Sequence, residues 1–278
     1  MNKGDLVSVI IPTYNEASVI KTLLLSLSKQ SYKNIETIVL DDGSTDDTAE
    51  IAKTYTSRVY VREHVERSAQ RNFGARQAKG EFLLFLDADM ELTINVILDC
   101  VHTIEKNKKI GGIVIPEQSV ARTFWEKVKA YERSFYNEAG DKTTDAARFF
   151  RRQAFEKVRG YDESITGPED WDLPESIKNK GYSIGRIKSR ILHHERLFNP
   201  FTLMKKKYYY GLKSHRYFKK QNISIISPKT IYFLRPVFYR NWRKLISNPI
   251  LSIAMIFMFS FELAGGGVGY LVGKYLHK

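Results

Sequence analysis

Two aspartates separated by one alanine, Asp87 and Asp89, come directly after the predicted strand Glu81–Leu86. Side chains two residues apart point to the same side of a strand, so the two carboxylates lie together. Paired carboxylate oxygens suit a hard divalent cation, Mn²⁺ or Mg²⁺, that keeps open positions for phosphate oxygens. The alternative interpretation is an ordinary acidic surface turn.

Further polar clusters follow predicted strands or loops. They are Pro12-Thr13-Tyr14-Asn15-Glu16, Asp41-Asp42-Gly43-Ser44, Glu169-Asp170-Trp171-Asp172 and His193-His194. For His193, the plain interpretation is a histidine that lies exposed at a strand end. Asp172 is interpreted as a helix-start acid, and Glu16 either as such an acid or as a ligand contact.

The elements that must position these residues alternate between two types. The apolar periodicity predicts strands at Leu6–Ile11, Glu36–Leu40, Arg58–Val61 and Glu81–Leu86, and helices at Glu16–Gln30, Asp46–Thr54 and Ser68–Lys79. This alternation predicts an α/β fold with a mixed, mostly parallel sheet and helices on both faces. Ligands of such sheets bind beyond the carboxyl ends of the strands. The clusters that follow these strands, at Pro12–Glu16, Asp41–Ser44 and Asp87–Asp89, are therefore expected to share one rim of the sheet.

The second half continues less regularly. We predict helices at Trp125–Tyr136, Arg152–Val158 and Leu173–Lys180, and one strand at Ile184–Leu192 that ends in His193. The single cysteine, Cys100, excludes an intramolecular disulfide and fits a buried thiol in a reducing compartment. The first residues lack the apolar core of a secretory signal, so we expect the bulk of the chain in the cytosol.

The net charge of +13 is concentrated near one end of the chain. Residues 1–195 carry 29 Lys and Arg against 30 Asp and Glu, whereas residues 196–261 carry 13 basic and no acidic residues. A nucleic-acid site would also be basic, but it needs no apolar run directly after it. A basic collar that faces anionic lipids accounts for both features, so we expect membrane lipids and no nucleic acid as partners.

The apolar run Ile250–Val272 contains one ionisable residue, Glu262, whose cost its apolar residues offset. Gly265, Gly266, Gly267 and Gly269 interrupt it, which leaves open a straight span, a re-entrant hairpin or close packing against another helix. The preceding Ile223–Arg240 suits short interfacial helices. We therefore predict a catalytic domain at 1–195, a basic, amphipathic interfacial segment at 196–245 and a C-terminal helical membrane-associated segment at 246–278 that is transmembrane or re-entrant, with the catalytic domain on the cytoplasmic side.

The ordered motifs resemble those of family 2 glycosyltransferases with the GT-A fold. The resemblance covers roughly Leu6–Glu195 and rests on Val9–Glu16, Asp41–Asp46, Arg71-Asn72 with Gly74, Asp87–Asp89 and Glu169–Asp172. It implies a Rossmann-like GT-A sheet, a UDP- or GDP-sugar donor, a divalent metal (Mn²⁺ or Mg²⁺) and transfer that inverts the anomeric carbon.

The resemblance also implies roles for single residues. Pro12, Tyr14, Glu16, Asp41 and Asp42 would hold the nucleoside, and Arg71 the nucleotide or its phosphates. Asp87 would reach the ribose and, with Asp89 and His193, the metal. Asp170 would be the general base, with Glu169 and Trp171 beside the acceptor. Core packing is the alternative for Trp171.

The acceptor is predicted from the tail. A polyprenyl-phosphate or other lipid-linked acceptor at the cytoplasmic membrane face fits the basic and apolar segments. The Gln-x-x-Arg-Trp motif of processive members is absent, and Lys205–Gly211 lies in that region, which favours single sugar addition. Two alternatives remain, a soluble or protein acceptor and a catalytically silent membrane scaffold.

Overall fold

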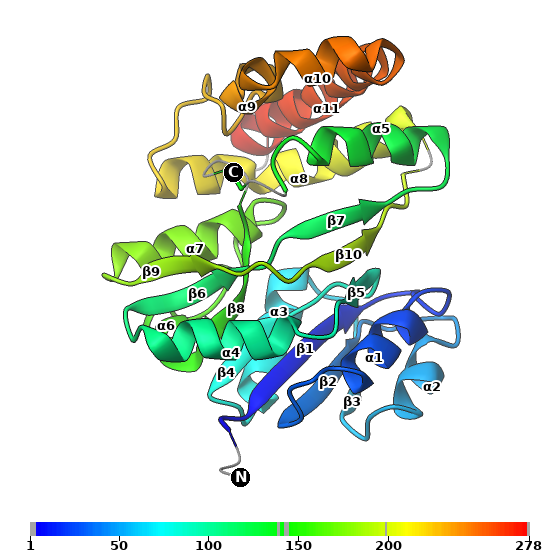
Figure 1. The fold of residues 1–278 in the computed structure, drawn as a ribbon. Coiled ribbons are helices and arrows are strands. Elements are labelled where there is room, and N and C mark those ends of the chain that lie inside the picture. The colour runs from blue at the N-terminus through cyan, green and yellow to red at the C-terminus, as the bar shows by residue number, and fades with distance from the viewer. Residues whose placement is uncertain (1–3, 138–139, 142–144, 198, 277–278) are drawn as a thin grey trace. The chain divides into compact units, whose positions relative to one another are not determined.

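The computed structural model describes residues 4–137, 140–141, 145–197 and 199–276, which form two compact units (Figure 1). The first unit combines Met1–Glu117, Ala146–Glu163 and Leu173–His193. The second combines Gln118–Asp145, Ser164–Asp172 and His194–Lys278. These units do not follow the predicted boundary at residue 195, because two earlier segments join the C-terminal helices. As a division into functional domains, that boundary stays a prediction.

The first unit is built on a sheet whose described strands run in the order β3-β2-β1-β4-β8-β6-β9. They are β1 (Val7–Thr13), β2 (Ile35–Asp41), β3 (Val59–Val61), β4 (Phe82–Phe85), β6 (Ile110–Val114), β8 (Ala147–Arg151) and β9 (Ser183–Arg186). Strand β8 is antiparallel to both of its neighbours, and the other pairings are parallel. The predicted mixed, mostly parallel sheet is confirmed.

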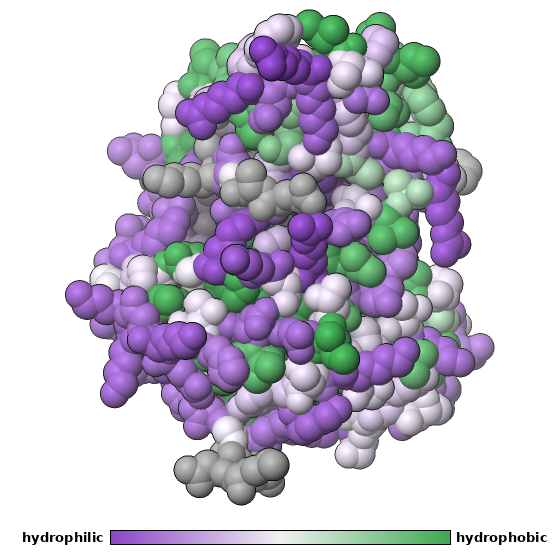
Figure 2. All heavy atoms as spheres, in the orientation of Figure 1, coloured by the Kyte–Doolittle hydropathy of each residue, from purple (hydrophilic) through white to green (hydrophobic). Residues whose placement is uncertain are grey.

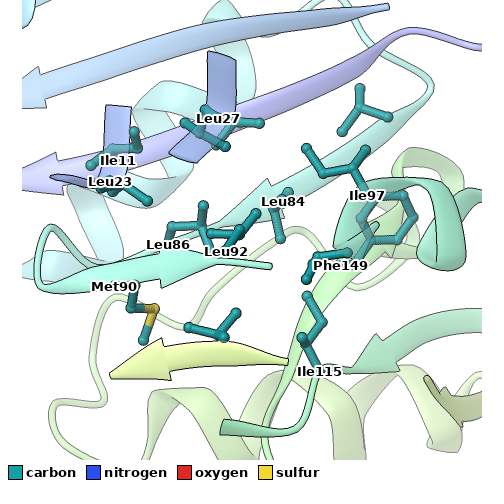
Figure 3. Close-up of a cluster of buried hydrophobic side chains, with 14 of the residues drawn as sticks. Ile11, Leu23, Leu27, Leu84, Leu86, Met90, Leu92, Ile97, Ile115 and Phe149 are labelled. Carbon is teal, nitrogen blue, oxygen red and sulfur yellow. The ribbon is translucent and has the colours of Figure 1, made fainter. Parts of the chain in front are cut away.

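Helices pack on both faces of this sheet because neighbouring residues of a strand point to opposite sides. Ile11 belongs to a core with α1 and α4, whereas Ile10 belongs to a second core with α3, α6 and α7. Figure 3 shows the first core, in which Leu23 and Leu27 of α1 lie over β1. The helices are α1 (Ile20–Ser28), α2 (Thr48–Lys53), α3 (Arg67–Gln77), α4 (Val96–Lys106), α6 (Arg152–Lys157) and α7 (Glu169–Asn179).

The carboxyl ends of β1, β2 and β4 meet at one edge of the sheet. Thr13 lies opposite Asp41 in the register, and the Asp42 amide donates a hydrogen bond of 2.9 Å to the Thr13 carbonyl. The Leu86 amide donates likewise to the Ile10 carbonyl at 3.1 Å. The predicted common rim is therefore confirmed.

The prediction of one strand at Ile184–Leu192 is wrong. The segment forms β9 in the large sheet and then β10 (Ile191–His194), which pairs antiparallel with β5 (Met90–Leu92). Between them, the Ser189 hydroxyl donates to Asp99 and the Arg190 amide to Thr93 at 3.2 Å. These bonds redirect the chain, so that His193 lies opposite Met90, next to Asp89.

The second unit is helical. Its elements are β7 (Glu117–Val120), which begins in the first unit, α5 (Phe124–Arg133), α8 (Pro200–Lys220), the 3₁₀ turn Tyr232–Leu234, α9 (Pro236–Arg240), α10 (Trp242–Ser247) and α11 (Pro249–Tyr275). Asn199 caps α8 by accepting from the Thr202 amide at 2.9 Å. Residues of α5, α9 and α11 share one core that includes Val128, Phe238 and Phe259.

Helix α11 continues without a break through its glycines, which removes the re-entrant hairpin from the predicted alternatives. Gly265, Gly269 and Gly273 recur every four residues and so share one face. A Cβ added at any of them would overlap a backbone carbonyl oxygen of α8, at Met204, Tyr208 and Leu212 respectively. Small residues at this spacing let two helix backbones touch. Close packing against a partner helix, one of the three alternatives, is therefore confirmed, and the partner is α8.

Replacing Gly269 with Ala is expected to lower the free energy of unfolding by about 1–3 kcal/mol, because the added methyl group must push α8 away. Gly267 is the matched control in the same helix, since a Cβ there meets nothing within 4 Å. Gly267→Ala should be neutral or stabilising by up to about 1 kcal/mol. Thermal unfolding of the two variants measures the difference, and equal melting temperatures would contradict the close contact.

Candidate active site

Asp42 connects the rim to the chain that follows β3. Its Oδ1 accepts hydrogen bonds from the Val65 amide at 2.9 Å and from the Gln70 side chain, and its Oδ2 lies 2.5 Å from His64 Nδ1. Its side chain is buried. These contacts fix the loop that enters α3, so Asp42 shapes the predicted nucleoside site.

Asp41 and Thr13 present polar atoms that the described protein leaves unpaired. The Asp41 Oδ2 accepts from the Ser44 amide at 3.0 Å. The Asp41 Oδ1 and the Thr13 Oγ1 are buried, and neither has a hydrogen-bond partner among the described residues. Buried polar atoms are almost always hydrogen-bonded. The donor groups of a bound nucleoside would satisfy both atoms.

The turn after β1 is held by the Asp41–Ser44 turn. Asn15 adopts a positive φ of 52°, and its amide donates to Ser44 Oγ at 2.9 Å. Tyr14 is 49% exposed with its ring 5.5 Å from that of His64, so it can stack on a ligand. Glu16 lies four residues before α1, and its carbonyl accepts from the Val19 and Ile20 amides. Glu16 is thus not a first-turn residue of α1, and its contact with a nucleotide stays a prediction.

Asp87 is gripped by two arginines. Arg71 Nη2 lies 2.9 Å from its Oδ1, and Arg148 Nη1 lies 3.4 Å from its Oδ2. Burial opposes ionisation, but the guanidinium groups of Arg148 and Arg71 outweigh it and hold the pKa of Asp87 well below its usual range. Because both oxygens face cations, these contacts favour the predicted ribose role of Asp87 over a metal role.

Asp89 and His193 come together where β5 and β10 pair. Asp89 Oδ2 lies 3.7 Å from His193 Nε2, and the buried Asp89 Oδ1 has no hydrogen-bond partner in the described part of the chain. The other ring nitrogen, Nδ1, lies 3.0 Å from Glu117 Oε2. A carboxylate on the far nitrogen is the usual way in which proteins orient a metal-binding histidine.

These residues fit a divalent cation. No group of three or more His, Cys, Asp or Glu side chains placed to hold a metal occurs among the described residues. The protein would therefore supply two ligands, Asp89 and His193, and leave the other positions to diphosphate oxygens. Such an open site is typical of cations that bind together with a phosphorylated substrate.

Two residues of this site were missed by the sequence analysis. Arg148 bridges Asp87 and Glu117, with its Nε 2.8 Å from Glu117 Oε1. Glu117 in turn orients His193. Arg148 lies in a strand between buried apolar residues, and a charge in such a place must be paired. That signal could have identified it, whereas no comparable pattern marks Glu117.

The segment Glu169–Asp172 forms the first turn of α7 and belongs to the second unit. Helix α7 starts four residues before its predicted start, and the amides of Trp171 and Asp172 both donate to the Pro168 carbonyl at 3.0 Å. Glu169 is buried, whereas Asp170 and Trp171 are half-buried. The structure thus unites Asp87, Asp89 and His193 in the first unit and carries Asp170 in the second.

Helix α8 contacts this segment and the residues before it, from Ser164 to Asp172. Arg216 Nη1 donates to the Ser164 carbonyl at 3.0 Å. Gly167 has a φ of +100°, and a Cβ there would overlap the Tyr210 ring. The buried carboxylate of Asp172 accepts from Lys220 Nζ and Gln221 Nε2, both at 2.7 Å. The interpretation of Asp172 as a structural acid is consistent with these contacts.

Replacing Asp172 with Ala is expected to destabilise the chain by about 1–3 kcal/mol, because Lys220 and Gln221 lose a charged acceptor. Any catalytic step that uses the neighbouring Asp170 should slow, while donor binding in the first unit should persist. Calorimetric nucleotide titration beside steady-state kinetics measures both. Asp172→Asn, which can still accept one bond, should recover part of the stability.

The chain is similar to known glycosyltransferases. Residues 8–159 match the family described as Glycosyl transferase family 2. The poly(ribitol-phosphate) β-N-acetylglucosaminyltransferase TarS of Staphylococcus aureus is 27% identical over 242 residues, which are 81% of this chain and 38% of TarS. An uncharacterised glycosyltransferase of Rickettsia typhi is 29% identical over 183 residues, 61% of this chain and 58% of that protein. The chain thus spans less than two thirds of either relative.

Solved structures share the fold at low sequence identity. The mannosyltransferase PcManGT of Pyrobaculum calidifontis, in complex with GDP-Man and Mn²⁺, has a TM-score of 0.64 and 16% identity, covering 99% of this chain and 88% of its own. Residues 1–349 of TarS, in complex with UDP-GlcNAc, have a TM-score of 0.55 and 17% identity, with 97% of this chain and 91% of that fragment covered. Since the family match takes in more than half of the chain, this protein belongs to glycosyl transferase family 2 and has the GT-A fold that its motifs predicted.

Proposed function

We propose that the protein transfers one sugar from a nucleoside diphosphate sugar to a lipid-linked acceptor at the cytoplasmic face of a membrane, with inversion and with a divalent metal. The meeting of Asp89 and His193 carries this proposal. The pairing of β5 with β10 sets His193 opposite Met90, next to Asp89, and Asp89 keeps a buried oxygen without a hydrogen-bond partner among the described residues.

The first unit would bind the nucleotide-sugar donor and the metal. Asp41, Thr13 and Tyr14 would bind the nucleoside, and Arg71 and Arg148 hold Asp87 ionised toward the ribose. The metal would supply positive charge that makes the diphosphate a better leaving group. TarS and PcManGT have been solved with UDP-GlcNAc and GDP-Man, so both uridine and guanosine donors are candidates.

The acceptor end would be managed by the second unit. Asp170 would take the proton of the acceptor hydroxyl while that oxygen attacks the anomeric carbon opposite the departing diphosphate. One base suffices for such an in-line displacement, which inverts the anomeric centre. Buried Glu169 would orient Asp170, and half-buried Trp171 would offer a face to the acceptor sugar.

A lipid-linked acceptor is favoured by what surrounds Asp170. Its segment is held by α8, and α8 packs along α11, the one described helix long and apolar enough to cross a membrane. The basic residues of 196–261 suit the phosphate of a polyprenyl-phosphate carrier. A phosphate-rich polymer is the second candidate, favoured by the poly(ribitol-phosphate) named for TarS.

Purified full-length protein, incubated with UDP- and GDP-sugars, tests the proposal. We expect slow donor hydrolysis that needs Mn²⁺ or Mg²⁺ and stops in EDTA, and transfer to polyprenyl phosphate in detergent. Transfer to poly(ribitol phosphate) alone would replace the lipid acceptor with the polymer. If the protein shows no hydrolysis and no transfer with any donor, that result would contradict the enzymatic role and favour a silent scaffold.

A further inference from the structure

Helix α11 exposes one continuous apolar stripe. At 3.6 residues per turn, its exposed large hydrophobic residues all fall on one side of the helix, with the exposed Ser260 and Ala264 among them. They are Ile250, Ile253, Ile256, Phe257, Leu263, Val268, Leu271 and Tyr275. Figure 2 shows hydrophobic side chains among those that cover the helices labelled α10 and α11 in Figure 1. A stripe of this length is unusual on a surface that only meets water.

The opposite face of α11 is committed to protein. Its glycines touch the backbone of α8, and Glu262 is buried between two lysines. Lys129 Nζ of α5 lies 2.9 Å from Glu262 Oε1, and Lys207 Nζ of α8 lies 3.3 Å from its Oε2. The one acidic residue of the helix is therefore neutralised inside the unit, and α8 cannot leave α11 without breaking the buried Lys207–Glu262 ion pair.

This attachment argues against a simple span. From Met204 to Leu212, α8 lies against α11 at backbone contact, so a crossing α11 would draw α8 into the bilayer. The half-buried or exposed cations of α8 are Lys205, Lys206, Lys207, Lys213, Arg216, Lys219 and Lys220. At the bilayer centre one Lys or Arg costs roughly five times what one Leu or Ile gains. The exposed stripe of α11 cannot offset so many charges.

We infer that α11 lies in the plane of the membrane as a monotopic anchor, with its exposed stripe at the boundary between head groups and acyl chains and with both ends on one side. The occupant of this surface is an anionic bilayer, because residues 196–261 carry 13 basic and no acidic side chains. Exposed Tyr239, Trp242 and Ile246 of α9 and α10 are of the types that enter this layer.

An in-plane anchor has a consequence for the reaction. Helix α8 contacts α11 on one side and holds Ser164, Gly167 and Asp172 on another. The segment of Asp170 is thereby fixed to the membrane-bound helices, where a lipid-linked acceptor presents its phosphate. The inference rests on the membrane association in the proposed function and is independent of the sugar-transfer chemistry.

Cysteine labelling of the full chain tests the orientation. Asn248→Cys and Leu276→Cys place thiols just beyond the two ends of α11, at exposed positions outside the stripe, and the native Cys100 is fully buried. In inverted membrane vesicles, whose cytoplasmic side faces out, an impermeant maleimide should label both variants, and in intact cells neither. Labelling of one variant in each preparation would show a span and overturn the inference.

Vesicle binding of purified protein, without donor or acceptor, tests the occupant. Ile253→Glu with Leu271→Glu should lower binding to phosphatidylglycerol vesicles at least about tenfold with an unchanged circular dichroism spectrum. Ile94→Glu, at a residue of the first unit that is 60% exposed, is the control and should bind normally. Unchanged binding of the double variant would refute the inference. A second result would also refute it: the wild-type protein sediments as a dimer, the double variant sediments as a monomer, and vesicles bind neither of them. A second copy of the chain would then cover the stripe.

Discussion

Replacing Asp170 with Asn is expected to lower kcat for sugar transfer about a thousandfold, or roughly 4 kcal/mol of barrier. The amide keeps the shape of the side chain but cannot take the proton of the acceptor hydroxyl. Donor binding should remain normal, because Asp41 and Asp42, the residues proposed to hold the nucleoside, belong to the first unit. Initial rates at saturating donor and calorimetric titration of the nucleotide measure the two effects separately.

The control for this variant lies on the same helix. Glu175 of α7 is partly exposed, and its Oε1 lies 3.2 Å from Lys178 Nζ. Glu175→Gln removes the same charge at one turn's distance and should leave kcat within about twofold. A fall of kcat in both variants would indicate a general electrostatic effect, and an active Asp170→Asn enzyme would assign the base to another residue.

Replacing Asp89 with Asn is expected to abolish metal-dependent activity, with a loss of about a thousandfold or more. A neutral amide is a poor ligand for Mn²⁺, and the buried Oδ1 of Asp89 has no hydrogen-bond partner among the described residues that would compensate. The nucleotide should then bind with equal, weak affinity in Mn²⁺ and in EDTA. Electron paramagnetic resonance of bound Mn²⁺ reads the metal directly.

A graded series around Asp89 separates ligands from their supports. His193→Ala should weaken Mn²⁺ binding, and Glu117→Gln, which only orients His193 at 3.0 Å, should cost about 10–100-fold. Asp47→Asn is the matched control, because Asp47 is an exposed acid at the start of α2 without a capping hydrogen bond. Metal binding that survives Asp89→Asn but is lost with Asp47→Asn would move the metal site to another part of the rim.

Local order explains why much of the first unit could be predicted. Apolar runs such as Val9–Ile11, followed by helices, specify parallel strands whose carboxyl ends share an edge. Asp42 and Asp87 follow such strands directly, so their place on the rim depends on a few neighbouring residues. The position of β8 in the sheet could not be predicted in this way, because the sequence of β4 does not indicate that its antiparallel neighbour comes from a distant part of the chain.

Contacts between distant residues explain what the sequence left open. Arg148 reaches Asp87 from 61 positions away, and Glu117 reaches His193 from 76. These contacts depend on strand order, which no local pattern encodes. The misread segment Ile184–Leu192 has the same cause, since β10 leaves the large sheet only because β5 offers it a partner.

The sequence by itself determined the family, the α/β sheet, the rim that carries the aspartates and the separation of charge toward the C-terminal helices. Only the tertiary structure decided which unit carries Asp170, what Glu262 pairs with and what the α11 glycines face. Strand period and motif order are local properties that a chain displays in one dimension. A buried ion pair or a glycine contact exists only when a second element arrives, and here that element is α8.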